Sequence, residues 1–219
     1  MIAQRVIRRD VAIPVENVKL EGELTVPESA KGLVLFAHGS GSSRHSARNK
    51  YVAGVIRNAG LGTLLFDLLT SEEEAYDVRT GHLRFDIRLL AKRLAVATEW
   101  LCGQEGLQGL SIGYFGSSTG GGAALVAAAE LGDQVAAVVS RGGRPDLAAE
   151  ALRNVRSPVL LIVGGLDDVV IGLNEEAYMH LRCQKELTIV PGATHLFEEP
   201  GKLDQVARLA AAWFARWLK

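Results

Sequence analysis

Three residues of the types used in nucleophilic catalysis stand well apart in the sequence, at Ser118, Asp167 and His195. A serine hydroxyl is a weak nucleophile at neutral pH, so it needs a base within hydrogen-bond reach. Histidine can be that base because its ordinary pKa lies near neutrality. A carboxylate on the other ring nitrogen orients the imidazole and stabilises its charged form. Together they predict acyl transfer in which Ser118 attacks, His195 moves the proton and Asp167 orients His195.

The local sequence around Ser118 favours it as the nucleophile. It is the central residue of the G-x-S-x-G pattern at 116–120, so it has glycine two residues away on both sides. Such a pattern is typical of a sharp strand-to-helix turn that exposes the serine, where larger flanking side chains would collide with backbone. The alternative nucleophile, Ser117, has Phe115 and Thr119 at the equivalent positions. These do not suit a strained turn.

The acid and the base each leave an alternative open. Gly164 and Gly165 end a predicted buried strand, and Asp167 follows two residues later. Asp168 is the alternative acid, and the acidic pair is also compatible with a solvated helix start. His195, taken alone, is compatible with an ordinary surface histidine in a turn.

An acyl-transfer site also needs two N–H donors for the oxyanion. One is expected from Thr119, the residue after the nucleophile. We expect the other from Ser40, because Gly39 and Gly41 let the loop turn inward without a side chain in the way. His38, at the start of this loop, is interpreted as a buried structural residue bonded to loop backbone rather than as a second base.

The elements that must position these residues alternate between buried strands and helices. Continuous apolar runs are typical of strands inside a parallel sheet, and the helices between them must cover both of its faces. The expected strands are Gly32–Ala37, Gly62–Asp67, the run from Ser111 to the turn, Val135–Ser140, Pro158–Val163 and Glu186–Val190. The expected helices are Ala47–Ala59, Leu83–Cys102, the run Ala123–Ala129, Asp146–Asn154, Leu173–Arg182 and a C-terminal helix with Leu203 and Trp217 on its buried side.

Two further segments complete the prediction. Gln4–Ile13 and Asn17–Val26 read as an antiparallel pair of strands at one edge of the sheet. Leu68–Thr80 reads as a polar loop. Between Ser140 and Pro158 there is room for one loop and one short helix only, so we expect a single domain over 1–219 without a cap.

Every candidate group follows the end of a predicted parallel strand, and these ends share one edge of the sheet. The order Ser, Asp, His along the chain is the order found in the α/β-hydrolase fold. We therefore predict that fold, with a mostly parallel sheet of about eight strands.

Composition excludes several other classes of protein. The formal net charge of −1 over 219 residues gives no electrostatic basis for binding nucleic acid or an anionic membrane. Met1–Asp10 lacks the apolar stretch of a secretory signal, and no apolar run is long enough to span a bilayer. Cys102 and Cys183 are expected to be free thiols in a reducing compartment. These features predict a cytoplasmic protein, and no motif predicts a metal or another cofactor.

Basic side chains cluster on loops expected at the functional edge, namely Arg44, Arg141 and Arg144. They predict a basic mouth that binds anionic substrates. The alternative is solvated loop charge paired with the acidic run Glu72–Glu74.

The chain resembles the α/β-hydrolases and, more narrowly, the dienelactone hydrolase-like group. Nearly the whole chain takes part in the resemblance, which implies a hydrolase. Dienelactone hydrolases themselves use a cysteine nucleophile, where this chain has Ser118. The run from His38 to Ser46 also resembles hydrolase domains fused to phosphoribosyltransferases. The motifs that carry the resemblance are Phe36–Gly41, Gly116–Gly121, Gly164–Asp167 and Gly192–His195.

The predicted activity is hydrolysis of short or compact carboxylic esters by a serine enzyme whose partner is a small molecule. Thioester or lactone hydrolysis is the alternative within the fold. A non-catalytic binding protein of the same fold is the alternative from another class.

Overall fold

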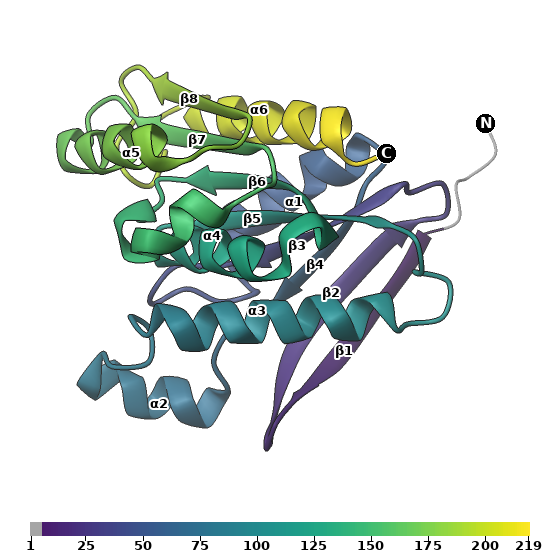
Figure 1. Cartoon of the computed structure of the whole chain (residues 1–219). Helices are drawn as coiled ribbons and strands as arrows, with labels where there is room; N and C mark the ends of the chain where they lie inside the picture. Colours follow the sequence, from purple (N-terminus) through teal and green to yellow (C-terminus); the bar gives the residue numbers. More distant parts are fainter. Residues whose placement is uncertain (1–5) are drawn as a thin grey trace.

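A computed structural model of the chain describes residues 6–219 and shows one eight-stranded sheet with helices on both faces (Figure 1). The strand order is β1-β2-β4-β3-β5-β6-β7-β8, and all pairs from β4 to β8 are parallel. The strands are β1 (Val6–Val15), β2 (Val18–Pro27), β3 (Gly32–Ala37), β4 (Gly62–Phe66), β5 (Ser111–Ser117), β6 (Val135–Arg141), β7 (Val159–Gly164) and β8 (Lys185–Val190).

The helices form two layers. Helices α1 and α6 pack together on one face, and α3 and α4 pack together on the other, where η2 and α5 continue the layer. The helices are α1 (Ala47–Asn58), α2 (Ser71–Thr80), α3 (Ile87–Cys102), α4 (Thr119–Leu131), α5 (Asp168–His180) and α6 (Lys202–Trp217), with short 3₁₀ segments η1 (Gly132–Gln134) and η2 (Pro145–Asn154).

The burial of the central strands explains why their sequences are apolar. Every residue of β3, β4 and β7 is buried, which is why these strands are apolar throughout rather than alternating. The N-terminal pair is antiparallel, and β2 joins the sheet by antiparallel pairing with β4. The predicted mostly parallel sheet with an antiparallel edge and no cap domain is confirmed. Gln4, the predicted start of the first strand, lies outside the described residues.

The prediction of a loop over Leu68–Thr80 is wrong, because Ser71–Thr80 forms helix α2. Its start is a capping box: Thr70 Oγ1 accepts from the N–H of Glu73, and Glu73 Oε2 accepts from the N–H of Thr70. Its end is Gly81, in the left-handed conformation that glycine adopts without strain. The acidic run therefore belongs to the first turn of a helix, where negative charge is favourable.

Helix α2 is tied to α3 by ion pairs. Arg93 of α3 donates two hydrogen bonds of 2.6 Å to the carboxylate of Glu73. Asp77 accepts from the side chain of Arg84 at 2.6 Å in the connection to α3. Figure 1 shows α2 on the outside of α3, away from the sheet. These bonds set the helix at one side of the edge where the strands end.

Two predicted helix starts and the type of one predicted helix were also wrong. Helix α3 begins at Ile87, not Leu83, because Asp86 caps it by accepting from the N–H of Leu89 at 3.0 Å. Helix α5 begins at Asp168, five residues before Leu173, since the N–H of Ile171 already bonds to the carbonyl of Asp167. The predicted helix at 146–154 is a 3₁₀ segment broken at Ala149, where φ is 42°.

Among residues 6–219 there is no helix both long and apolar enough to span a membrane.

Candidate active site

Ser118 occupies a strained turn between β5 and α4. Its φ of 50° and ψ of −121° are unusual for a residue with a side chain. Three backbone hydrogen bonds hold this conformation: its N–H donates to the carbonyl of Arg141, and its own carbonyl accepts from the N–H groups of Gly121 and Arg144. The backbone is therefore fixed by α4 and by the loop after β6.

The glycines two residues away on each side of Ser118 are required by close packing. A Cβ atom at Gly116 would lie 2.5 Å from the carbonyl oxygen of Gly120. A Cβ at Gly120 would collide with the carbonyl oxygens of Ala37 and His38 at the end of β3. The two glycines of the G-x-S-x-G pattern are therefore positions where backbone packs directly on backbone. The contact of Gly120 with Ala37 and His38 brings the loop after β3 close to the serine.

His195 and Asp167 are hydrogen-bonded to each other. The Nδ1 atom of His195 lies 2.6 Å from Oδ2 of Asp167, although the residues are 28 positions apart. Because a carboxylate only accepts, Nδ1 carries the proton and Nε2 is left as an acceptor. The Asp167 side chain is mostly buried and that of His195 is about one-third exposed, at 17% and 37%. Asp168 is instead the first residue of α5.

The loops that carry these two residues are packed directly against each other. The N–H of Leu166 donates to the carbonyl of Ala193 at 2.9 Å. A Cβ at Gly164 would lie 2.5 Å from that same carbonyl oxygen. Glu199 fastens the far side of the histidine loop, accepting from the hydroxyl of Thr194 at 2.6 Å. The Asp167–His195 pair is therefore held by its surrounding backbone.

The backbone of residues 141–142 lies between Ser118 and His195 and contacts both. The carbonyl of Arg141 accepts from Ser118, and the next residue, Gly142, lies against the imidazole, where a Cβ would be 3.4 Å from Nδ1. Between these two described side chains there is no hydrogen bond. In unliganded enzymes such bonds are often long and shorten when substrate binds.

The loop after β3 runs across the serine and is held by His38. A Cβ at Gly39 would be 3.1 Å from the Cβ of Ser118. His38 accepts from the N–H of Leu68 at Nε2 (2.9 Å), so its Nδ1 carries the proton, 3.0 Å from the carbonyl of Gly39. Burial lowers the pKa of His38 below its usual value. The neutral His38 side chain thus links the loop after β3 to the loop after β4 by hydrogen bonds.

The two residues expected to supply oxyanion donors are in contact. The N–H of Ser40 donates to the side-chain oxygen of Thr119 at 3.0 Å. The backbone N–H of Thr119 belongs to the first residue of α4, a position without an acceptor inside the helix.

The three arginines predicted to bind substrate differ in their partners. Arg44 pairs with Asp67 and with Glu21, and Arg144 donates two hydrogen bonds to Asp146 at 2.7 and 2.8 Å. Neither of them pairs with the run 72–74. Arg141 is only 6% exposed, and no carboxylate of residues 6–219 lies within 4.0 Å of its nitrogens.

A small cavity opens beside Ser40 and Thr119. It has about 10 Å³ of free volume, close to the room that one water needs. Its apolar wall consists of Leu68, Leu69 and Leu90, and Glu74 and Arg84 stand at its side nearest α2. Of the lining residues, Glu74 belongs to α2, which sequence reasoning took for a loop. The capping pattern Thr70-Ser71-Glu72-Glu73 was the available signal.

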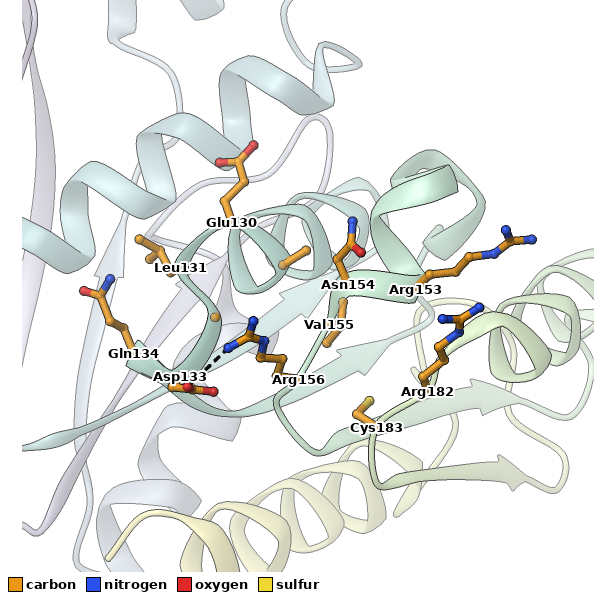
Figure 2. A pocket seen from close by; sticks show the side chains of 12 residues that line it. Glu130, Leu131, Asp133, Gln134, Arg153, Asn154, Val155, Arg156, Arg182 and Cys183 are labelled. Carbon is orange, nitrogen blue, oxygen red and sulfur yellow. Dashed lines mark hydrogen bonds and ion pairs between the residues drawn. The ribbon is translucent and has the colours of Figure 1, made fainter.

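A groove of about 1060 Å³ lies elsewhere. Its lining residues precede the starts of β6, β7 and β8. The groove therefore lies at the amino ends of these strands, whereas Ser118 lies at the carboxyl end of β5. Figure 2 shows the arginines around it and the ion pair of 3.4 Å between Arg156 and Asp133. It holds none of the predicted catalytic residues.

Comparison with known proteins agrees with this architecture. A crystal structure of dienelactone hydrolase from Anabaena variabilis is 60% identical with a TM-score of 0.96, covering 98% of this chain and 99% of that chain. A putative phosphoribosyl transferase of Mycobacterium tuberculosis is 58% identical over 205 residues, which are 94% of this chain and 45% of that protein. This chain thus matches less than half of the length of that relative.

More distant structures share the fold alone. Est1E from Butyrivibrio proteoclasticus is 15% identical with a TM-score of 0.79, covering 94% of this chain and 98% of that chain. The profile of the dienelactone hydrolase family matches residues 24–219, which takes in every residue of the candidate site. The chain has the α/β-hydrolase fold and belongs to the dienelactone hydrolase family.

Proposed function

We propose that the protein is a serine hydrolase that cleaves carboxylic esters through an acyl-enzyme. The observation that carries the proposal is the 2.6 Å bond from His195 to Asp167, next to a serine held in a strained turn. With Asp167 on Nδ1, the imidazole presents Nε2 as the base for Ser118.

The residues divide the reaction into two similar steps. Ser118 Oγ attacks the ester carbonyl while Nε2 of His195 takes its proton, and the same proton then goes to the departing alcohol. Water repeats the sequence on the acyl-enzyme and frees the acid. Asp167 keeps the imidazole in the required tautomer.

A first experiment decides between this proposal and a non-catalytic binding protein. A fluorophosphonate probe, followed by mass spectrometry of peptides, should label Ser118. Lack of labelling together with lack of turnover on esters, thioesters and lactones would favour the binding protein. Relative rates on these three substrate classes choose among the hydrolase activities. The proposed partner is a small-molecule ester and the proposed location is the cytoplasm, where Cys102 and Cys183 would stay the free thiols found here.

Acyl chain length should limit the activity. Each buried CH₂ contributes about 0.8 kcal/mol, but only as long as the pocket has room. The cavity beside Thr119 has little. We expect kcat/KM on p-nitrophenyl esters to be best for short acyl groups, with no rate increase on emulsions.

A pocket variant makes this test sharper. Leu69→Ala removes part of the apolar wall and should move the optimum to a longer acyl chain. A steady rise through long-chain esters in the wild type, or activation at an oil–water interface, would contradict the prediction.

Arg141 has the strongest support among the arginines for binding an anionic group of the substrate. Its guanidinium stacks on the ring of Phe197, 5.8 Å from the centroid, two residues beyond His195. Burial, with a smaller effect of Arg48, lowers its pKa to about 10, so it is still charged at neutral pH. A buried cation without a counterion is costly to stability, which is often a sign of function.

Replacing Arg141 should therefore affect charged substrates selectively. For Arg141→Met we expect kcat/KM on a p-nitrophenyl monoester of succinate to fall about 10-fold or more, the worth of one hydrogen bond to a charged group. The neutral butyrate ester should be nearly unaffected, and the melting temperature should not fall.

The matched control is Arg153→Met in the groove at the opposite edge of the sheet, which should change neither rate. An unchanged ratio of the two rates in Arg141→Met would contradict the role of Arg141. Substrate contacts by Arg44 and Arg144 stay predictions.

A further inference from the structure

The contact between Ser40 and Thr119 leaves one hydrogen-bond donor without a partner. Ser40 N–H donates to Oγ1 of Thr119 at 3.0 Å. A hydroxyl that accepts one hydrogen bond still has its own proton to donate. Among residues 6–219, no group accepts that proton. Thr119 is 2% exposed, so this donor is buried without a partner in the protein.

The same contact removes the donor expected from the loop. An amide has a single hydrogen, and that of Ser40 is directed at Thr119. A hole built from two backbone N–H groups would need this bond to break or to be shared. Of the two amides expected as donors, that of Thr119 has no acceptor among residues 6–219 and that of Ser40 is directed at Thr119, whereas the general pattern for the fold has two free amides.

The place of the Thr119 side chain suits it for the missing role. It directly follows Ser118 in the chain. With Ser40 and Gly39 it lines the small cavity, and a Cβ at Gly39 would be 3.1 Å from the Cβ of Ser118. A buried hydroxyl without an acceptor costs free energy, and a ligand oxygen in this position would satisfy it.

We propose that the side chain of Thr119 is itself an oxyanion donor, with Ser40 acting through it. This inference rests on the proposed serine hydrolase function. As Ser118 Oγ bonds to the carbonyl carbon, the electron pair of the C=O bond moves onto oxygen. That oxygen then accepts from the N–H and the Oγ1–H of Thr119, and Thr119 keeps its proton throughout. The N–H of Ser40 polarises the hydroxyl and orients it.

Substitutions at Thr119 separate this arrangement from a hole made of two amides. Thr119→Val and Thr119→Ala should each lower kcat by about 10²- to 10³-fold, the usual loss for one oxyanion donor, with little change in KM. Thr119→Ser keeps a hydroxyl and should stay within about tenfold of wild type. In Thr119→Ala the N–H of Ser40 is released, so a two-amide hole predicts wild-type or higher activity for that variant.

A trifluoromethyl ketone analogue of the ester gives a readout that misfolding or loose packing would not imitate. Its adduct with Ser118 carries the oxyanion, so its inhibition constant should rise across the Thr119 series by the factor by which kcat falls. KM for the ester should not follow. Melting temperatures show that each variant is folded.

Two failures are distinguishable. If wild-type protein is labelled at Ser118 and Thr119→Ala is fully active, the role of the hydroxyl is overturned while the hydrolase proposal stands. Failure of the analogue's inhibition constant to track kcat has the same meaning. If wild-type protein is neither labelled nor active on any ester, the proposed function falls, and this inference falls with it.

Discussion

Ser118→Ala should abolish ester hydrolysis, with a fall in kcat on the order of 10⁶-fold, as in other serine hydrolases that lose the nucleophile. The variant lacks only a hydroxyl for which the structure gives no hydrogen bond to His195, so the fold should survive. The positive φ of 50° is no more difficult for alanine than for serine. The measurements are initial rates on a short-chain ester and fluorophosphonate labelling of the folded variant.

Ser117→Ala is the matched control. Its hydroxyl is buried and lies 3.4 Å from Oδ1 of Asn49 in α1, on the side of the sheet covered by α1 and α6. That variant should keep its labelling and most of its rate. Labelling that moved to residue 117, or full turnover in Ser118→Ala, would refute the assignment of the nucleophile.

Asp167→Asn should lower kcat by about 10⁴-fold, the loss measured when the acid of a chymotrypsin-type triad becomes an amide. The amide can donate to Nδ1 of His195, which then favours the tautomer with its proton on Nε2. An imidazole in that form cannot accept the proton of Ser118. Substrate binding does not need this tautomer, so KM should change far less.

Asp168→Asn provides the comparison, since it is chemically identical and one residue away. Asp168 begins α5 and is not bonded to His195, so only a weak effect on the helix end is expected, about 0.3–1 kcal/mol of stability. The two variants should be assayed side by side on one ester. If the losses were reversed, Asp168 would be the acid and the hydrogen bond in the structure would not be the functional one.

The sequence determined the fold because its signals are local and repeated. A strand buried on both faces must be apolar throughout. Glycine is needed at 116 and 120 because a side chain at either position would collide with neighbouring backbone. The order of the three candidate residues placed each after a different parallel strand. Helix α2 was equally readable, from a capping box at Thr70 and a terminal Gly81, but its polar composition made it look like a loop.

Tertiary structure decided those distant partnerships for which the sequence carries no motif. Ser40 and Thr119 are 79 residues apart, and no local pattern says that one donates to the other instead of to a substrate. Arg44 and Arg141 look alike in sequence, since both were predicted on loops at the functional edge. In the structure Arg44 is paired with Asp67, whereas Arg141 is the last residue of β6 and is buried with no carboxylate partner among residues 6–219.

The physical reason is the difference in range between the two kinds of information. Backbone conformation and burial follow from a residue and its near neighbours, through steric exclusion and hydrophobic periodicity. Hydrogen-bond partners, ion pairs and cavity walls follow from which loops the sheet brings to one edge, and a shift of one ångström there changes a partner. Sequence therefore named Ser118, Asp167 and His195, and only the folded chain showed that the N–H of Ser40 donates to the hydroxyl of Thr119.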